Sequence, residues 1–117
     1  PTGTVSASDK NLKNSIEELD IEKSSAFIYS LKPSRYKYND GESGRFHHGL
    51  IAQEVKESMG DDDWGLYVDT HINGNFSLDE EDFLALRYEE LIADLIATVQ
   101  SQNERIKVLE SALKGGK

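Results

Sequence analysis

Residues 88–114 read YEELIADLIATVQSQNERIKVLESALK, and this stretch decides how the chain is built. Its apolar residues recur at alternating spacings of four and three, which is the heptad pattern of a coiled coil. The a positions are Ile92, Val99, Ile106 and Leu113, and the d positions are Leu95, Gln102 and Leu109. We therefore predict a long C-terminal helix with a narrow apolar stripe, followed by a flexible tail at 115–117.

A coiled coil implies an oligomer, and the charges beside the stripe suit parallel neighbours. Arg105 falls at a g position and Glu110 at the following e position. The core positions do not fix the number of chains, because β-branched residues at a with Leu at d favour dimers in simple peptides. Gln102 at a buried d position would set the register at some cost in stability. The alternative is an amphipathic helix that packs on its own domain.

The rest of the chain is long enough for one small domain of short elements. Helical spacing predicts helices at 9–19, with Ser8 as N-cap, and at 25–31 and 52–59. Alternation predicts strands at 35–38, 45–51 and 66–68, with turns at 39–44 and at Asn73-Gly74. The predicted fold class is α+β, with short helices and β-hairpins over 8–87 and the long helix over 88–114. Residues 1–7 are small and polar and form a connector.

Composition excludes several classes of partner and site. The 117 residues hold 13 Lys and Arg against 22 Asp and Glu, a formal net charge of −9. This acidity argues against nucleic-acid backbones and anionic membranes as partners. The absence of cysteine excludes a disulfide framework and a cysteine metal site. We find neither a signal peptide nor an apolar run of membrane-spanning length, and we expect a soluble protein.

Three motifs stand in order along the chain. They are SDKNLK at 8–13, HGLIAQEV at 48–55 and LRYEEL at 86–91, and the last leads into the heptad helix. Each is short, but in this order they resemble the endosialidase-type intramolecular chaperone domain. That domain lies at the C-terminus of phage tailspikes, tail fibres and neck appendages. The resemblance covers roughly residues 8–113.

The resemblance implies self-cleavage by a Ser-Lys dyad. Ser8 maps onto the nucleophile, Lys13 onto the base and His48 onto a supporting histidine, with the cut between Ala7 and Ser8. A serine hydroxyl needs a neighbour to take its proton, and a lysine can do so if burial or nearby positive charge lowers its pKa. Because Ser8 and Lys13 are five apart, they cannot share a face of an ideal helix. Ser8 must lie at the cap, with Lys13 reaching back or a neighbouring subunit helping.

The resemblance also implies the partners and the setting. The chain would be a homotrimer without cofactors, and its folding client would be the upstream fibre segment of the same polypeptide, with residues 1–7 as its stub. It would act in the host-cell cytoplasm during phage assembly and leave the mature fibre after cleavage.

Other readings remain open for the same residues. Ser8 alone is most often an N-cap, Lys13 a solvated charge and His48 a satisfied core histidine. The chain could then be a trimerisation module that does not cleave. Residues 69–80 nearly fit an EF-hand calcium loop, with Asp69, Asn73, Gly74 and Glu80 at ligand or turn positions. His71 departs from that pattern, and we predict a hairpin turn and no metal.

Overall fold

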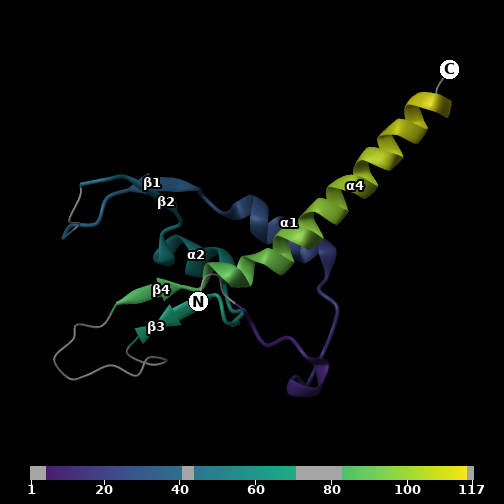
Figure 1. Ribbon diagram of the computed structural model, residues 1–117. Helices are drawn as coiled ribbons and strands as arrows, with labels where there is room; N and C mark the ends of the chain where they lie inside the picture. Colours follow the sequence, from purple (N-terminus) through teal and green to yellow (C-terminus); the bar gives the residue numbers. More distant parts are fainter. Residues whose placement is uncertain (1–4, 41–43, 71–82, 116–117) are drawn as a thin grey trace.

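The computed structural model describes residues 5–40, 44–70 and 83–115. It is an α+β arrangement of short elements from which one long helix projects (Figure 1). The fold class and the long C-terminal helix are thus as predicted, whereas the oligomeric coiled coil stays a prediction. The elements in order are η1 (Lys10–Leu12), α1 (Ile21–Ser30), β1 (Ser34–Tyr36), β2 (His47–Gly49), α2 (Ala52–Met59), β3 (Tyr67–Asp69), β4 (Leu84–Leu86), η2 (Tyr88–Glu90) and α4 (Leu91–Gly115).

Local signals explain where two of the helices begin and end. The side chain of Asp20 caps α1 by accepting from the backbone N–H groups of Glu22 and Lys23, so α1 begins four residues before the predicted start at 25. It ends ahead of Pro33, which cannot continue a helix. Helix α2 spans the predicted 52–59. It stops at Gly60, whose φ of 61° suits glycine.

The predicted helix at 9–19 is wrong. Only the single turn η1 forms, and its N-cap is Asp9 rather than Ser8. The apolar residues that suggested the helix, Leu12, Ile16 and Leu19, are 71%, 67% and 50% exposed. A short helix is marginal without a packed apolar face, and here no core receives that face. Ser15, with a φ of 54°, also departs from helical geometry.

The strands form two separate antiparallel ribbons. In the first, β1 pairs with β2 and Tyr36 lies opposite His47; in the second, β3 pairs with β4 and Val68 lies opposite Ala85. The strands at 34–36 and 47–49 are shorter than predicted, the strand at 67–69 is shifted by one residue, and β4 was not predicted at all. The predicted turn at Asn73-Gly74 lies outside the described residues. The β1–β2 ribbon reaches away from the globule (Figure 1).

The apolar core is small and joins α2, the start of β3 and the start of α4. Its buried members are Val55, Met59, Leu66 and Leu91. Partly buried residues complete it: Phe27, Ile28, Leu31, Leu50, Trp64, Tyr67 and Leu86. Trp64 packs against this core, with its ring edge-on to Phe27 at a centroid distance of 4.9 Å. This core fixes the N-terminal end of α4 to the globule.

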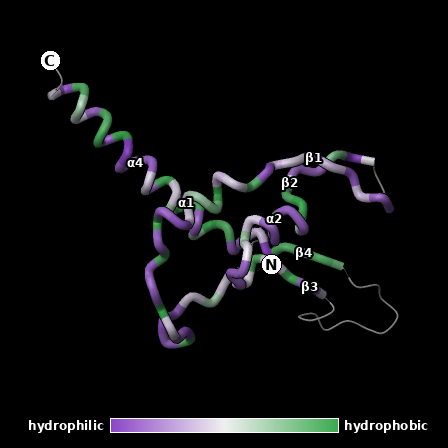
Figure 2. The backbone as a smooth tube through the Cα atoms, turned by 180° about the vertical axis from the view of Figure 1, so that it is seen from behind, coloured by the Kyte–Doolittle hydropathy of each residue, from purple (hydrophilic) through white to green (hydrophobic). Residues whose placement is uncertain are grey.

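Helix α4 has two unlike faces. Its buried face consists of Leu91, Asp94, Ala97, Thr98 and Ser101, and it packs along α1, whose Ser24 and Ser25 are also buried. Beyond Ser101 every described residue of α4 is exposed, and the C-terminal part of the helix projects from the globule (Figures 1 and 2). Among the described residues, no helix is long and apolar enough to cross a membrane.

The predicted heptad stripe lies on the exposed side of α4. Ile92, Leu95, Val99, Ile106, Leu109 and Leu113 are between 47% and 82% exposed. Gln102 donates from Nε2 to the Tyr29 hydroxyl at 3.1 Å. After Leu91, the single chain therefore leaves the large apolar residues of the stripe uncovered.

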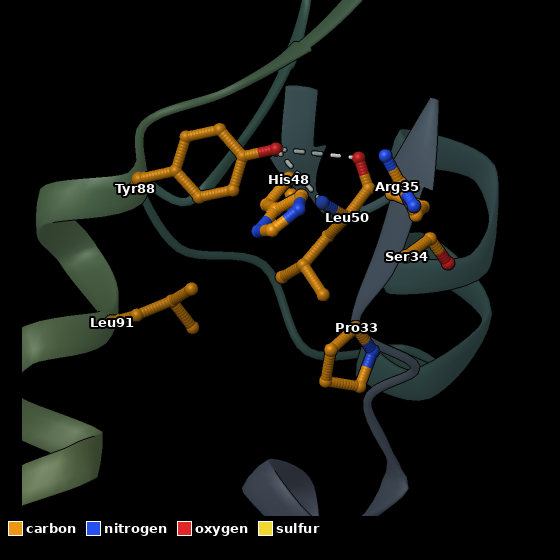
Figure 3. Close-up of a pocket in the computed structure, with 8 residues that line it drawn as sticks. Pro33, Ser34, Arg35, His48, Leu50, Tyr88 and Leu91 are labelled. Atoms are coloured by element: carbon orange, nitrogen blue, oxygen red, sulfur yellow. Dashed lines mark hydrogen bonds between the residues drawn. The ribbon is translucent and has the colours of Figure 1, made fainter. Parts of the chain in front are cut away.

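The root of the β1–β2 ribbon is fastened to the start of α4 by one tyrosine. The Tyr88 hydroxyl lies 3.0 Å from the backbone nitrogen of Leu50 and 3.3 Å from its oxygen (Figure 3). Gly49 makes this approach possible, because a Cβ there would lie 2.7 Å from the Tyr88 hydroxyl and 3.0 Å from that of Tyr36.

We predict that Gly49→Ala destabilises the fold by about 1–3 kcal/mol, because the added methyl group overpacks the ribbon root. Chemical denaturation measures the change. In a Tyr88→Phe background, which lacks the nearest oxygen, the same substitution should cost less. An equal loss of unfolding free energy in both backgrounds would show that the Tyr88 hydroxyl is not the reason why position 49 requires glycine.

Candidate functional site

Ser8 and Lys13 meet in the structure. Lys13 Nζ donates to Ser8 Oγ at 2.8 Å. Between them, η1 makes one tight turn capped by Asp9, after which Lys13 returns to extended backbone with φ −123° and ψ 159°. This turn resolves the difficulty of the five-residue spacing, because Ser8 lies before the turn and Lys13 reaches back across it.

The backbone around Ser8 is open. Residues 5–13 are all exposed, so the peptide bond between Ala7 and Ser8 is accessible. The backbone N–H of Asn11 is taken by the Asp9 carboxylate at 2.9 Å. Those of Asp9 and Lys10 have no acceptor among the described residues, and free N–H groups of this kind can donate to an oxyanion. The Ser8–Lys13 pair is within hydrogen-bonding distance, and both side chains are open to solvent.

His48 lies on β2, opposite Arg35 of β1. It is exposed, so it is not the satisfied core histidine of the alternative reading. It lines a wide, mostly apolar hollow of about 590 Å³ together with residues including Pro33, Leu50 and Tyr88 (Figure 3). The hollow lies at the root of the ribbon, where the ribbon meets the start of α4.

The structure does not bring His48 to the Ser8–Lys13 pair. In Figure 1 the turn η1 and the β1–β2 ribbon lie on opposite sides of the globule, and the view from behind in Figure 2 shows the same separation. Within one copy, these three residues do not form one site.

A tyrosine cluster on the other face of the ribbon was not predicted as a unit. The hydroxyls of Tyr36 and Tyr38 lie 3.4 Å apart, and their rings contact His47. The hydrogen bond with Tyr38 raises the pKa of Tyr36 above its usual range, with burial adding to the shift, so Tyr36 stays a neutral phenol. The alternation of Tyr36 and Tyr38 in the sequence was the signal that they share a face.

The calcium alternative receives no support from the described part of the chain. Asp69 belongs to β3, and positions 71–80 of the loop lie outside the described residues. Within residues 5–40, 44–70 and 83–115, no group of three His, Asp or Glu side chains is placed to hold a metal ion.

The fold and the paired side chains define a class: a small α+β domain with a serine and a lysine in contact near its N-terminus and a long terminal helix. Residues 8–63 match the family model described as chaperone of endosialidase. No curated protein matches the chain. The match supports the resemblance to the endosialidase-type chaperone domain over residues 8–63, just under half of the chain. The model's name, Peptidase S74, is that of a self-cleaving serine peptidase type. The match includes Ser8, Lys13 and His48 and ends before α4.

Proposed function

We propose that this chain is an intramolecular chaperone that trimerises, folds the upstream part of a phage fibre or tailspike, and then releases itself by cutting between Ala7 and Ser8. The observation that carries the proposal is the 2.8 Å contact between Ser8 Oγ and Lys13 Nζ, directly after Ala7. The family match adds the chaperone role. The setting would be the host-cell cytoplasm during phage assembly.

The chemistry follows from the order of the groups. Neutral Lys13 takes the proton of the Ser8 hydroxyl, and Ser8 Oγ attacks the carbonyl carbon of Ala7. The oxyanion that forms is stabilised by nearby N–H groups. The C–N bond then breaks, the Ser8 nitrogen receives the proton from Lys13, and an ester joins Ala7 to Ser8 Oγ. Water hydrolyses this ester, which leaves a carboxylate on Ala7 and restores the serine.

The exposed stripe of α4 supports assembly. Large apolar residues along one helix face are costly to leave in water, and their heptad spacing allows identical helices to cover one another. A trimer formed first would bring three upstream strands together at high local concentration. Cleavage would then remove the chaperone, so the fibre could not unfold by the reverse route and its stability would be kinetic.

Cleavage tests the dyad. Ser8→Ala removes the nucleophilic oxygen, and Lys13→Met removes the base while keeping most of its stem. Both side chains are exposed and neither caps a helix, so both variants should assemble normally. Mass spectrometry of fresh protein should show residues 1–7 retained in both variants and lost from the unmodified chain.

Lys10→Met is the matched control, because it removes a lysine from the same turn and should cleave normally. Loss of residues 1–7 from Ser8→Ala at the original rate would mean that Ser8 is not the nucleophile. The chain would then be a trimerisation module that does not cut itself.

Assembly tests the stripe. The double variant Ile106→Asn/Leu109→Asn places two polar amides on the stripe. Both positions lie beyond Ser101, the last buried residue of α4, so the fold of the globule should be unaffected. We expect a monomer in sedimentation equilibrium where the unmodified chain is a trimer. Val108→Asn is the control, because Val108 is 66% exposed but lies off the stripe. An intact trimer in the double variant would refute assembly through α4.

The distance between His48 and the dyad leads to a complementation test. If His48 supports cleavage, it must reach the Ser8–Lys13 pair of another copy. Ser8→Ala and His48→Ala should each fail to cleave alone. When the two are co-expressed, intact-mass analysis should show the His48→Ala chains losing residues 1–7. Failure in the mixture would place His48 outside a shared site between subunits.

A further inference from the structure

A second groove lies on the side of the globule away from the β1–β2 ribbon. It runs between segment 17–20, α1, the end of α2 and the start of α4, with a volume of about 970 Å³. Its lining is strongly acidic: Glu17, Glu18, Asp20, Asp62, Asp63, Glu90 and Asp94 line it, with Lys23 as a cation. Phe27, Met59 and Trp64 give it an apolar floor.

One of these carboxylates belongs to a mostly buried residue but opens onto the groove. Asp94 is only 8% exposed and lines the groove, and among the described residues no buried side-chain oxygen lacks a hydrogen-bond partner. No donor and no ion pair to the Asp94 carboxylate occurs among the described residues, since the Thr98 hydroxyl donates to the backbone oxygen of Asp94. The carboxylate oxygens therefore face the groove and can accept from a cation that enters it.

The spread of the carboxylates favours an extended cationic segment over a single ion. No three acidic or histidine side chains of the described residues converge as metal ligands would. Instead, the acidic residues follow the length of the groove from segment 17–20 to α4. The apolar floor would suit an aromatic residue among the cations.

The β1–β2 ribbon presents such a segment. Arg35 lies 3.8 Å and Lys37 4.8 Å from the centre of the Phe46 ring, and His48 stands opposite Arg35 on the same face. We call these four residues the cationic face. All are exposed, Phe46 by 50%, and neither Arg35 nor Lys37 has a carboxylate partner among the described residues.

The two surfaces cannot meet within one copy, because the ribbon and segment 17–20 lie on opposite sides of the globule in both views (Figures 1 and 2). Two different complementary surfaces on opposite sides are what a cyclic oligomer needs, since each copy then engages the next and the ring closes. We propose that, in the trimer, the cationic face of each ribbon occupies the acidic groove of the neighbouring copy. This inference rests on the proposed trimer and names a second contact between its subunits.

Asp94→Asn tests the groove in the full chain. It removes the charge but keeps the shape, so the dissociation constant of the trimer, measured by sedimentation equilibrium, should rise at least about tenfold. The melting temperature of the dilute, dissociated chain should stay the same, because among the described residues the substitution breaks no side-chain hydrogen bond or ion pair of Asp94. Asp61→Asn is the control, because Asp61 belongs to the same acidic run as Asp62 but does not line the groove. Equal dissociation constants for the unmodified chain and Asp94→Asn would overturn the proposal.

The double variant Arg35→Gln/Lys37→Gln tests whether the ribbon is the segment that occupies the groove. This ribbon variant should weaken the trimer about as much as Asp94→Asn, and the combined variant should lose little more, since coupled residues are not additive. Lys10→Gln controls for the loss of a cation elsewhere. If Asp94→Asn weakens the trimer and the ribbon variant does not, another cation fills the groove and the assignment to the ribbon fails. An unmodified chain that is monomeric at all concentrations would instead refute the proposed trimer itself.

Discussion

The packing of α1 against α4 through small side chains is the constraint on which the rest of the structure depends. Ser24 and Ser25 of α1 face Ala97, Thr98 and Ser101 of α4, and these residues are buried. Small residues let the two helices approach closely, so α4 is held without using the large apolar side chains of its heptad stripe. The heptad stripe thereby stays available for other copies. The same contact holds segment 17–20 beside α4 and so shapes the acidic groove.

Much of the architecture could be predicted from the sequence because it depends on local signals. Helix α2 with its stop at Gly60 and the long terminal helix followed from spacing and chain breakers. The helix at 9–19 failed because periodicity shows an apolar face but not whether a core receives it. Strand β4 was missed because a run of three residues, Leu84–Leu86, carries too little pattern, and its pairing with β3 is a tertiary contact. Gln102 was placed in a stripe from its spacing, whereas its bond to Tyr29 depends on the packing of α1.

The candidate site, too, could be predicted from the sequence only in part. The motif at 8–13 identified Ser8 and Lys13. An ideal helix would keep these two side chains apart, whereas the capped turn between them brings them into contact. His48 came from the same resemblance, yet a sequence read as one chain cannot tell which residues meet between copies. The acidic groove was not predicted, because its acidic residues come from separate segments that only the packing of the helices brings together.

These features suggest why cutting would follow assembly. In a single copy, Ser8 and Lys13 touch but are open to water, which competes for the hydrogen bonds of both groups. The neighbouring ribbon, docked in the acidic groove, would approach segment 17–20 and the turn before it, carrying His48 on its cationic face. Enclosure of the turn would exclude that water and hold the two side chains in contact. A chaperone built in this way would remain attached while its copies are separate, and it would cut only once three chains are in register.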